Sequence, residues 1–175
     1  IGVLQLINSM VDGKIITFTE EHQKITSALS SQAAVAIENA QLTEQIKNAH
    51  LDTIMRLSSA AEFRDKETAN HINRVSHYTQ LIASKLGLPE DKVELLFWAA
   101  PMHDIGKVGI PDAILQKPGK LTPEERKLMQ QHTLIGAMIM KGTDIELLST
   151  SKIVALYHHE KFDGTGYPQG LKGKN

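Results

Sequence analysis

The sequence contains no cysteine, which excludes disulfide bonds, thiolate metal sites and cysteine nucleophiles. It also lacks an excess of charge of either sign, with 19 lysines and arginines against 20 aspartates and glutamates. Proteins that bind duplex nucleic acid usually carry a clear basic surplus, so we expect no such partner. A small anionic ligand is compatible with this balance, because a local lysine and metal ions can neutralise it.

Long hydrophobic runs are absent too. The longest run, Leu95–Met102, is far too short to cross a bilayer, and no segment resembles a signal peptide. The chain is therefore expected to be cytoplasmic. It begins at Ile1 without an initiator methionine and stops in the polar stretch 172–175. We expect both ends to be cuts in a longer parent protein, which can itself be membrane-associated.

Aromatic residues make up only 5% of the chain, although 41% of all residues are hydrophobic. This composition suits a mainly α-helical protein. The pattern predicts a strand over residues 2–8 and a turn at Asp12 and Gly13, and residues 15–18 form a short apolar run. Thr19 can cap a helix, and the absence of proline and glycine from there to Gly87 permits one very long helix or two joined helices.

A heptad repeat can be placed on this long helical stretch. Its a positions are Ile25, Gln32, Asn39, Ile46 and Thr53, and its d positions are Ala28, Val35, Leu42, Ala49 and Arg56. Polar residues hold several of these positions, so the apolar seam is weak. The pattern favours a coiled coil in a homodimer, and the alternative is an amphipathic face that packs within one chain.

The second half of the chain is expected to be helical with clear breaks. A helix over residues 93–102 follows the break at residues 87–89, and a loop contains Pro111, Pro118 and Gly119. Residues 122–125 read as a capping box with proline at the first helical position. That helix is expected to reach about residue 141, and another spans about 145–158 before a glycine-rich loop.

Histidines and carboxylates are spread over four of these helical segments. They are Glu67, His71, His103, Asp104, His132, His158 and His159. Glu67 and His71 are four residues apart and share one helix face, whereas adjacent helical residues diverge by about 100 degrees. Two or more metal ions fit such adjacent pairs better than one. The remaining histidines, His22, His50 and His77, are read as ordinary surface or core residues.

Nitrogen and oxygen donors without sulfur favour iron, manganese, zinc or cobalt. Metal ions about 3.5–4 Å apart are the usual device for cleaving a phosphodiester, because they polarise the phosphoryl oxygens and supply a nucleophile. Lys107 lies one turn beyond His103. Its ammonium group can neutralise a non-bridging phosphate oxygen.

These residues lie in strings that resemble the HD-GYP family. The first half of the resemblance is HDIGK at residues 103–107, followed by IPD at 110–112, Leu115, KPG at 117–119 and Leu121. The second half, residues 158–168, matches the motif HHExxDGxGYP at every fixed position. The resemblance covers roughly residues 51–175 and is highly specific.

The resemblance implies an HD-superfamily helical domain that hydrolyses cyclic di-GMP to linear pGpG, GMP or both. It implies two or three divalent metal ions, iron or manganese first, held by His71, His103, Asp104, His132, His158 and His159. Glu67 occupies the position that some members use for a third metal. His103, Asp104 and Lys107 would be catalytic, with Lys107 also on the scissile phosphate.

The family also implies a substrate-binding or partner-binding role for the glycine-rich loop. Its residues Gly164, Gly166, Tyr167 and Pro168 would lie beside cyclic di-GMP or beside a diguanylate cyclase partner. For the two glycines the alternative is simple backbone freedom in a turn. Family members continue into a helix with a further metal-binding aspartate, and this sequence stops at Asn175 before that residue.

The N-terminal part resembles the end of a GAF sensor domain. The matching residues are 2–8, Phe18, Glu21 and 33–40. The expected organisation is a GAF remnant over 1–40, a linker helix over 41–60 and an HD-GYP domain over 51–175 that is truncated at its C-terminus. The sensor would regulate the enzyme through the long helix.

Two other functions are compatible with the same residues. One is a non-catalytic receptor or interaction module for cyclic dinucleotides, although an intact set of ligands argues against it. The other is an HD phosphohydrolase for a different nucleotide, such as a mixed cyclic GMP-AMP.

Overall fold

The computed structural model describes residues 3–7, 9–65, 70–142 and 144–173. The helices are α1 (Glu20–Phe63), α2 (Asn70–Lys85), α3 (Glu90–Ala99), α4 (Asp112–Leu115), α5 (Pro123–Ile139) and α6 (Glu146–Tyr157). Two 3₁₀ helices, η1 (Ala100–Met102) and η2 (Ile105–Gly109), and two strands, β1 (Ser9–Val11) and β2 (Lys14–Ile16), complete the set. The mainly α-helical fold is therefore confirmed. No described helix combines the length and apolarity needed to cross a membrane.

The chain divides into two compact units, residues 1–50 and 51–175. In the first unit, β1 and β2 form an antiparallel hairpin in which Ser9 pairs with Ile16 and Val11 with Lys14. The predicted turn is confirmed: Asp12 and Gly13 have φ angles of 49° and 77°, as a two-residue hairpin turn requires.

The strand predicted over residues 2–8 is wrong for residues 3–7, which form no strand; Gly2 and Asn8 lie outside the described residues. The tight turn pairs only the residues that flank it directly. Residues 3–7 therefore have no partner strand among the described residues, and an apolar pattern alone does not form a strand.

Helix α1 begins as predicted, because Thr19 caps it. The Thr19 hydroxyl accepts a hydrogen bond from the His22 backbone N–H at 3.3 Å, and the Thr19 N–H donates to His22 Nδ1 at 3.2 Å. His22 thus has a structural role at the helix start. Of the two options for the glycine-free stretch, the structure has two helices, since α1 ends at Phe63 and α2 begins at Asn70.

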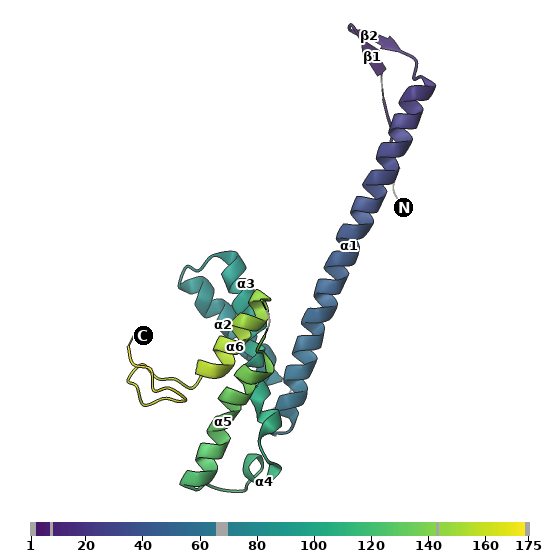
Figure 1. The fold of residues 1–175 in the computed structure, drawn as a ribbon. Coiled ribbons are helices and arrows are strands. Elements are labelled where there is room, and N and C mark those ends of the chain that lie inside the picture. The colour runs from purple at the N-terminus through teal and green to yellow at the C-terminus, as the bar shows by residue number, and fades with distance from the viewer. Residues whose placement is uncertain (1–2, 8, 66–69, 143, 174–175) are drawn as a thin grey trace. The chain divides into compact units, whose positions relative to one another are not determined.

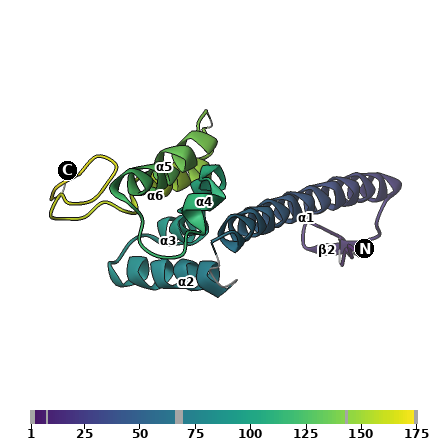
Figure 2. The same cartoon turned by 90° about the horizontal axis from the view of Figure 1, so that it is seen from below.

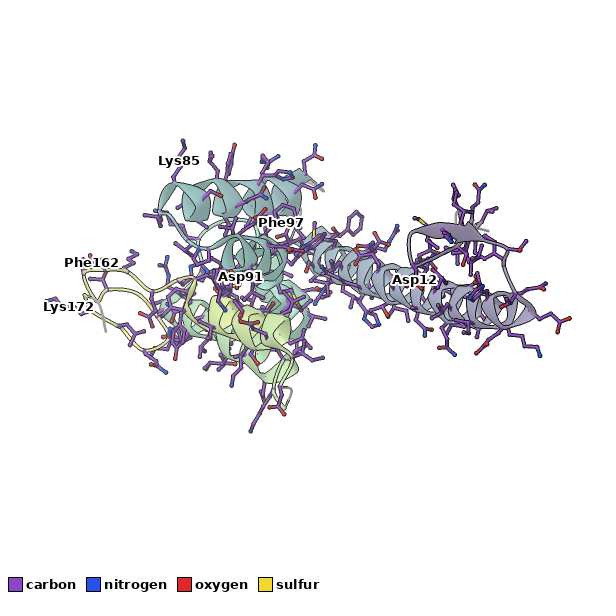
Figure 3. All side chains as sticks on the ribbon, turned by 90° about the horizontal axis from the view of Figure 1, so that it is seen from above. Asp12, Lys85, Asp91, Phe97, Phe162 and Lys172 are labelled. Atoms are coloured by element: carbon purple, nitrogen blue, oxygen red, sulfur yellow. The ribbon has the colours of Figure 1, made fainter. Side chains whose placement is uncertain are left out.

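In the second unit, α3 packs against α2 and α6, and α5 packs against α6 and η2 (Figures 1 and 2). The buried residues Met102, Met140 and Ala155, from η1, the end of α5 and α6, form one apolar cluster. A second cluster contains Ile110, Ile114 and Leu115. Figure 3 shows Phe97 between α2 and α3, where its ring contacts His77 at a centroid distance of 5.3 Å.

The predicted capping box of α5 is confirmed. The Thr122 hydroxyl accepts from the Glu125 N–H, and the Glu125 carboxylate accepts from the Thr122 N–H. The helix predicted over 93–102 is wrong at its end, because the α-helix stops at Ala99 and a 3₁₀ turn follows. Pro101 has no N–H for a helical hydrogen bond, and the His103 N–H instead donates to the carbonyl of Ala100 at 3.2 Å.

Candidate metal centre

The structure brings most of the predicted metal ligands into two groups. Ligand atoms of Asp104, His132, His158 and His159 lie within 4.8 Å of one another. His71 and His103 form a second group, together with Glu62. Glu67 lies outside the described residues. Both groups share a neighbourhood, because His103 Nε2 is 3.2 Å from Asp104 Oδ2.

Close packing of η2 on α5 brings Asp104 next to His132. A Cβ atom on Gly106 would lie only 1.9 Å from the His132 carbonyl oxygen and 2.5 Å from the Gly136 nitrogen. Only glycine fits between these two backbone segments. The glycine of the HDIGK string is therefore a steric requirement of the site.

Three histidines have their tautomer set by the main chain. The Nδ1 atoms of His103, His132 and His158 lie 3.0, 2.7 and 3.0 Å from carbonyl oxygens three residues earlier, those of Ala100, Met129 and Ala155. A carbonyl only accepts hydrogen bonds, so Nδ1 carries the proton. In the neutral ring, Nε2 then presents a lone pair.

These lone pairs point at an acceptor. The Nε2 atoms of His132 and His158 lie 3.2 and 3.4 Å from Asp104 Oδ1, and they are 3.3 Å from each other. Asp104 Oδ1 is buried and has no hydrogen bond. Acceptors that face one another in a buried place are satisfied when a proton or a metal ion lies between them. The donor set and its carbonyl-bonded histidines match those of metal sites, so this cluster could hold a divalent metal ion.

The surroundings of Asp104, His132 and His159 keep these three donors in the form that binds metal. Burial alone would raise the pKa of Asp104, but His103, His158 and Lys107 hold it well below its usual range. Burial lowers the pKa of His132, and burial with the neighbouring His158 lowers that of His159 to about 4. Asp104 is therefore an anion at neutral pH, whereas His132 and His159 are neutral.

The pKa values of His103 and Lys107 are raised, whereas those of His132 and His159 are lowered. Burial would lower the pKa of His103 and of Lys107, but the Asp104 carboxylate raises both above their ordinary values. Lys107 Nζ lies 2.9 Å from Asp104 Oδ2 and also donates to the Asp65 carboxylate. The ammonium group is thus held beside the cluster by two carboxylates.

Arg64 fixes the backbone of this segment and was not predicted from the sequence. Its guanidinium donates to the carbonyls of Lys107, Val108 and Ile110 at 3.2, 2.7 and 3.2 Å. It also forms an ion pair with Asp112 at 2.6 Å. Glu62 lies in the last turn of α1, and Arg64 and Asp65 follow the helix. No motif surrounds these residues, so only their long-range contacts reveal their roles.

The loop after α6 continues from the cluster. The Tyr167 ring stacks on His159 with a centroid distance of 4.5 Å and an interplanar angle of 22°, and burial raises the pKa of Tyr167 to about 12. A Cβ atom on Gly166 would lie 2.5 Å from the Glu160 Cα and 2.6 Å from the His159 carbonyl oxygen. Gly166 is therefore needed to hold Tyr167 against His159.

The other predicted loop residues have backbone roles. Gly164 has a φ angle of 82°, which favours glycine, and Pro168 follows a cis peptide bond. The Glu160 carboxylate accepts from three N–H groups, those of Gln169, Gly170 and Leu171. Figure 3 shows Phe162 and Lys172 on this loop, where the Phe162 side chain is exposed.

Residues 52–175 match the family described as HD domain. The chain is 40% identical over 145 residues to the cyclic di-GMP phosphodiesterase response regulator RpfG of Xanthomonas campestris pv. campestris. The match covers 82% of this chain and 38% of that protein. The chain is 49% identical over 116 residues to a cyclic di-GMP phosphodiesterase of Thermotoga maritima, 66% of this chain and 32% of the relative.

A third relative carries a different substrate in its name. The 3'3'-cGAMP-specific phosphodiesterase 2 of Vibrio cholerae is 36% identical over 155 residues, 89% of this chain and 30% of that protein. The chain thus spans roughly a third of the length of these relatives. With the family match and the HDIGK and HHExxDGxGYP strings in one helical unit, the chain belongs to the HD domain family and carries a domain of its HD-GYP type.

Proposed function

We propose that the protein is a metal-dependent phosphodiesterase that hydrolyses cyclic di-GMP to linear pGpG, GMP or both. The observation that carries this proposal is the convergence of histidine Nε2 lone pairs on the buried Asp104 oxygen that has no hydrogen bond. The printed names of relatives at 40% and 49% identity support cyclic di-GMP as the substrate.

In this proposal Asp104, His132, His158 and His159 hold one ion, and His71 and His103 contribute to another, with Glu67 as the further ligand that the family resemblance implies. The absence of sulfur donors is compatible with iron or manganese, the metals that the family resemblance implies first. When bound, such ions supply Lewis acidity to the phosphodiester and to the attacking water.

The chain's own groups would bind and orient the substrate. Lys107, charged and held 2.9 Å from Asp104, would neutralise a non-bridging phosphate oxygen. The Tyr167 phenol is protonated at neutral pH, and burial raises its pKa further, to about 12, so it can donate a hydrogen bond to the dinucleotide. Stacking on His159 holds that ring in place. Gly164, Gly166 and Pro168 would shape the loop around it.

The test is anaerobic purification of the protein, metal analysis and a cyclic di-GMP turnover assay. The expected result is at least two iron or manganese ions per chain and hydrolysis that is lost in His132→Ala. The matched control His50→Ala removes an exposed histidine and should retain both properties. Metal with tight binding but no hydrolysis would favour the receptor function instead, and a wild-type protein without metal would refute the proposed mechanism.

A second substrate is favoured by one specific observation. The relative at 36% identity is named for 3'3'-cGAMP, and the proposed contact of Lys107 is to phosphate and not to a base, so it would not distinguish the two substrates. Parallel assays with cyclic di-GMP and 3'3'-cGAMP would distinguish the two by their kcat/KM ratio.

We further propose the domain organisation expected from the sequence, with a GAF-like remnant over residues 1–40, a linker helix over 41–60 and an HD-GYP domain over 51–175. A homodimer through α1 is supported by heptad positions whose apolar side chains are exposed, among them Ile25, Val35, Leu42 and Ile46. Asn39→Leu should strengthen such a dimer and alter regulation by the sensor. Unchanged molecular mass and unchanged effector response would contradict it. A diguanylate cyclase partner would bind at the loop that carries Phe162.

A further inference from the structure

Glu62 is a buried carboxylate without an assigned role. It lies next to the last residue of α1 and is only 4% exposed. Both of its carboxylate oxygens are buried and neither has a hydrogen bond. Among the described residues, Asp104 is the only other carboxylate with such an oxygen.

An ionised carboxylate in this situation is costly. Burying a charge without a partner costs several kcal/mol or more, and a buried oxygen without a hydrogen bond adds about 1–3 kcal/mol. A folded chain keeps such a group where something else compensates for it. For Asp104 Oδ1, the oxygen without a hydrogen bond, a cation between it and the neighbouring histidines would be that compensation, and the same reasoning applies to both oxygens of Glu62.

The surroundings of Glu62 contain further metal donors. The His71 Nε2 atom is 3.9 Å from Glu62 Oε1, and one ligand atom each of Glu62, His71 and His103 lie within 4.8 Å of one another. A distance of 3.9 Å is too long for a hydrogen bond. Two ligands bound to one ion at about 2.0–2.2 Å, however, are separated by roughly 3–4 Å. The spacing fits coordination and not a direct hydrogen bond.

We propose that Glu62 is a carboxylate ligand of the second metal ion, which it holds together with His71 and His103 beside the Asp104 cluster. The proposal deepens the proposed phosphodiesterase function and rests on it for the role of that ion. It adds a ligand that the family motifs do not supply, since Glu62 lies outside the HDIGK and HHExxDGxGYP strings and is a different residue from Glu67.

The experiment uses Mn²⁺ as the probe and the Glu62→Gln variant, which keeps the side-chain volume and removes the charge. Manganese content and affinity are measured on the metal-stripped protein after reloading under anaerobic conditions. We expect the variant to bind one manganese at least about 10-fold more weakly than the wild type and to retain the other. His132→Ala should weaken the other ion, and the exposed Glu124→Gln should change neither.

Stability separates a ligand from a merely structural residue. Without metal, Glu62→Gln should unfold at the same or a higher urea concentration than the wild type, because it removes an uncompensated buried charge. With saturating Mn²⁺ the order should reverse. Equal manganese affinity and stoichiometry in wild type and variant, or the absence of this reversal, would overturn the assignment.

The outcome is independent of whether the enzyme reaction is as proposed. A wild-type protein that binds two manganese ions but does not hydrolyse cyclic di-GMP refutes the proposed function, while the Glu62→Gln titration still decides the ligand. Conversely, unchanged manganese binding in Glu62→Gln beside normal wild-type hydrolysis refutes only the ligand.

Discussion

Replacing Gly106 with alanine tests whether the site depends on backbone contact between η2 and α5. The added Cβ would lie 1.9 Å from the His132 carbonyl oxygen, 2.5 Å from the Gly136 nitrogen and 2.8 Å from the His132 carbonyl carbon. Real Cβ contacts essentially never fall below 3.0 Å. All three neighbours are backbone atoms of a helix, so no side chain can rotate away, and the two elements must separate by roughly 1 Å.

This separation has two consequences. Overpacking costs about 1–3 kcal/mol and occasionally more, and we expect the upper end because rigid backbone lies on both sides. About 3 kcal/mol corresponds to a decrease of roughly 10 °C in the melting temperature of a domain of this size. The shift also moves Asp104 away from His132, so the affinity for manganese should fall in parallel with stability.

Urea and thermal unfolding can be followed by the fluorescence of Trp98, the single tryptophan, which lies in α3. Gly109→Ala is the matched control in the same 3₁₀ helix. Its Cβ would meet only the Ile135 side chain, at 2.9 Å, and that side chain can adjust. Wild-type stability and manganese affinity in Gly106→Ala would refute the argument that η2 must touch α5.

Three other predictions concern the same unit. Chelation of metal should lower the melting temperature, because Asp104 loses its cation. If the free metal concentration before chelation is 100-fold above its Kd, the loss of stability is about 2.7 kcal/mol. A melting curve that does not change with chelator would contradict this prediction. Arg64→Lys cannot reproduce the planar fork that binds three carbonyls and should cost about 1–3 kcal/mol in urea unfolding, whereas Arg56→Lys in an exposed pair should cost almost nothing. Tyr167→Phe keeps the stack on His159 and should raise KM or lower kcat without changing manganese content, so wild-type kinetics would show that the phenol does not contact the substrate.

The sequence predicted those features whose cause is local. The Thr122 capping box, the Thr19 cap and the turn at Asp12 and Gly13 each depend on residues within three positions of one another. The histidines and Asp104 were identified because they lie in two contiguous motif strings and on two further helices. The structure brings their ligand atoms together, although their order in the chain says nothing about distances.

Features that depend on distant partners could not be predicted. The apolar pattern of residues 3–7 does not reveal whether a neighbouring strand exists. The end of α1 carries no proline or glycine, and Arg64 bonds to carbonyls more than 40 residues away. Glu62 looks like any polar residue near a helix end, and only its burial distinguishes it.

The two kinds of ligand in this site reach their positions in different ways. The Nδ1 protons of His103, His132 and His158 are held by main-chain carbonyls three residues earlier, so the metal-binding tautomer forms together with the helical backbone. Side-chain substitutions at the carbonyl-bearing positions should leave that tautomer unchanged. The carboxylates of Asp104 and Glu62 have buried oxygens without any such partner. The histidines are therefore preorganised by folding. Among the carboxylate oxygens, Oδ1 of Asp104 and both oxygens of Glu62 still lack a hydrogen bond, and metal loading should tighten η2 and the end of α1 more than α5 and α6.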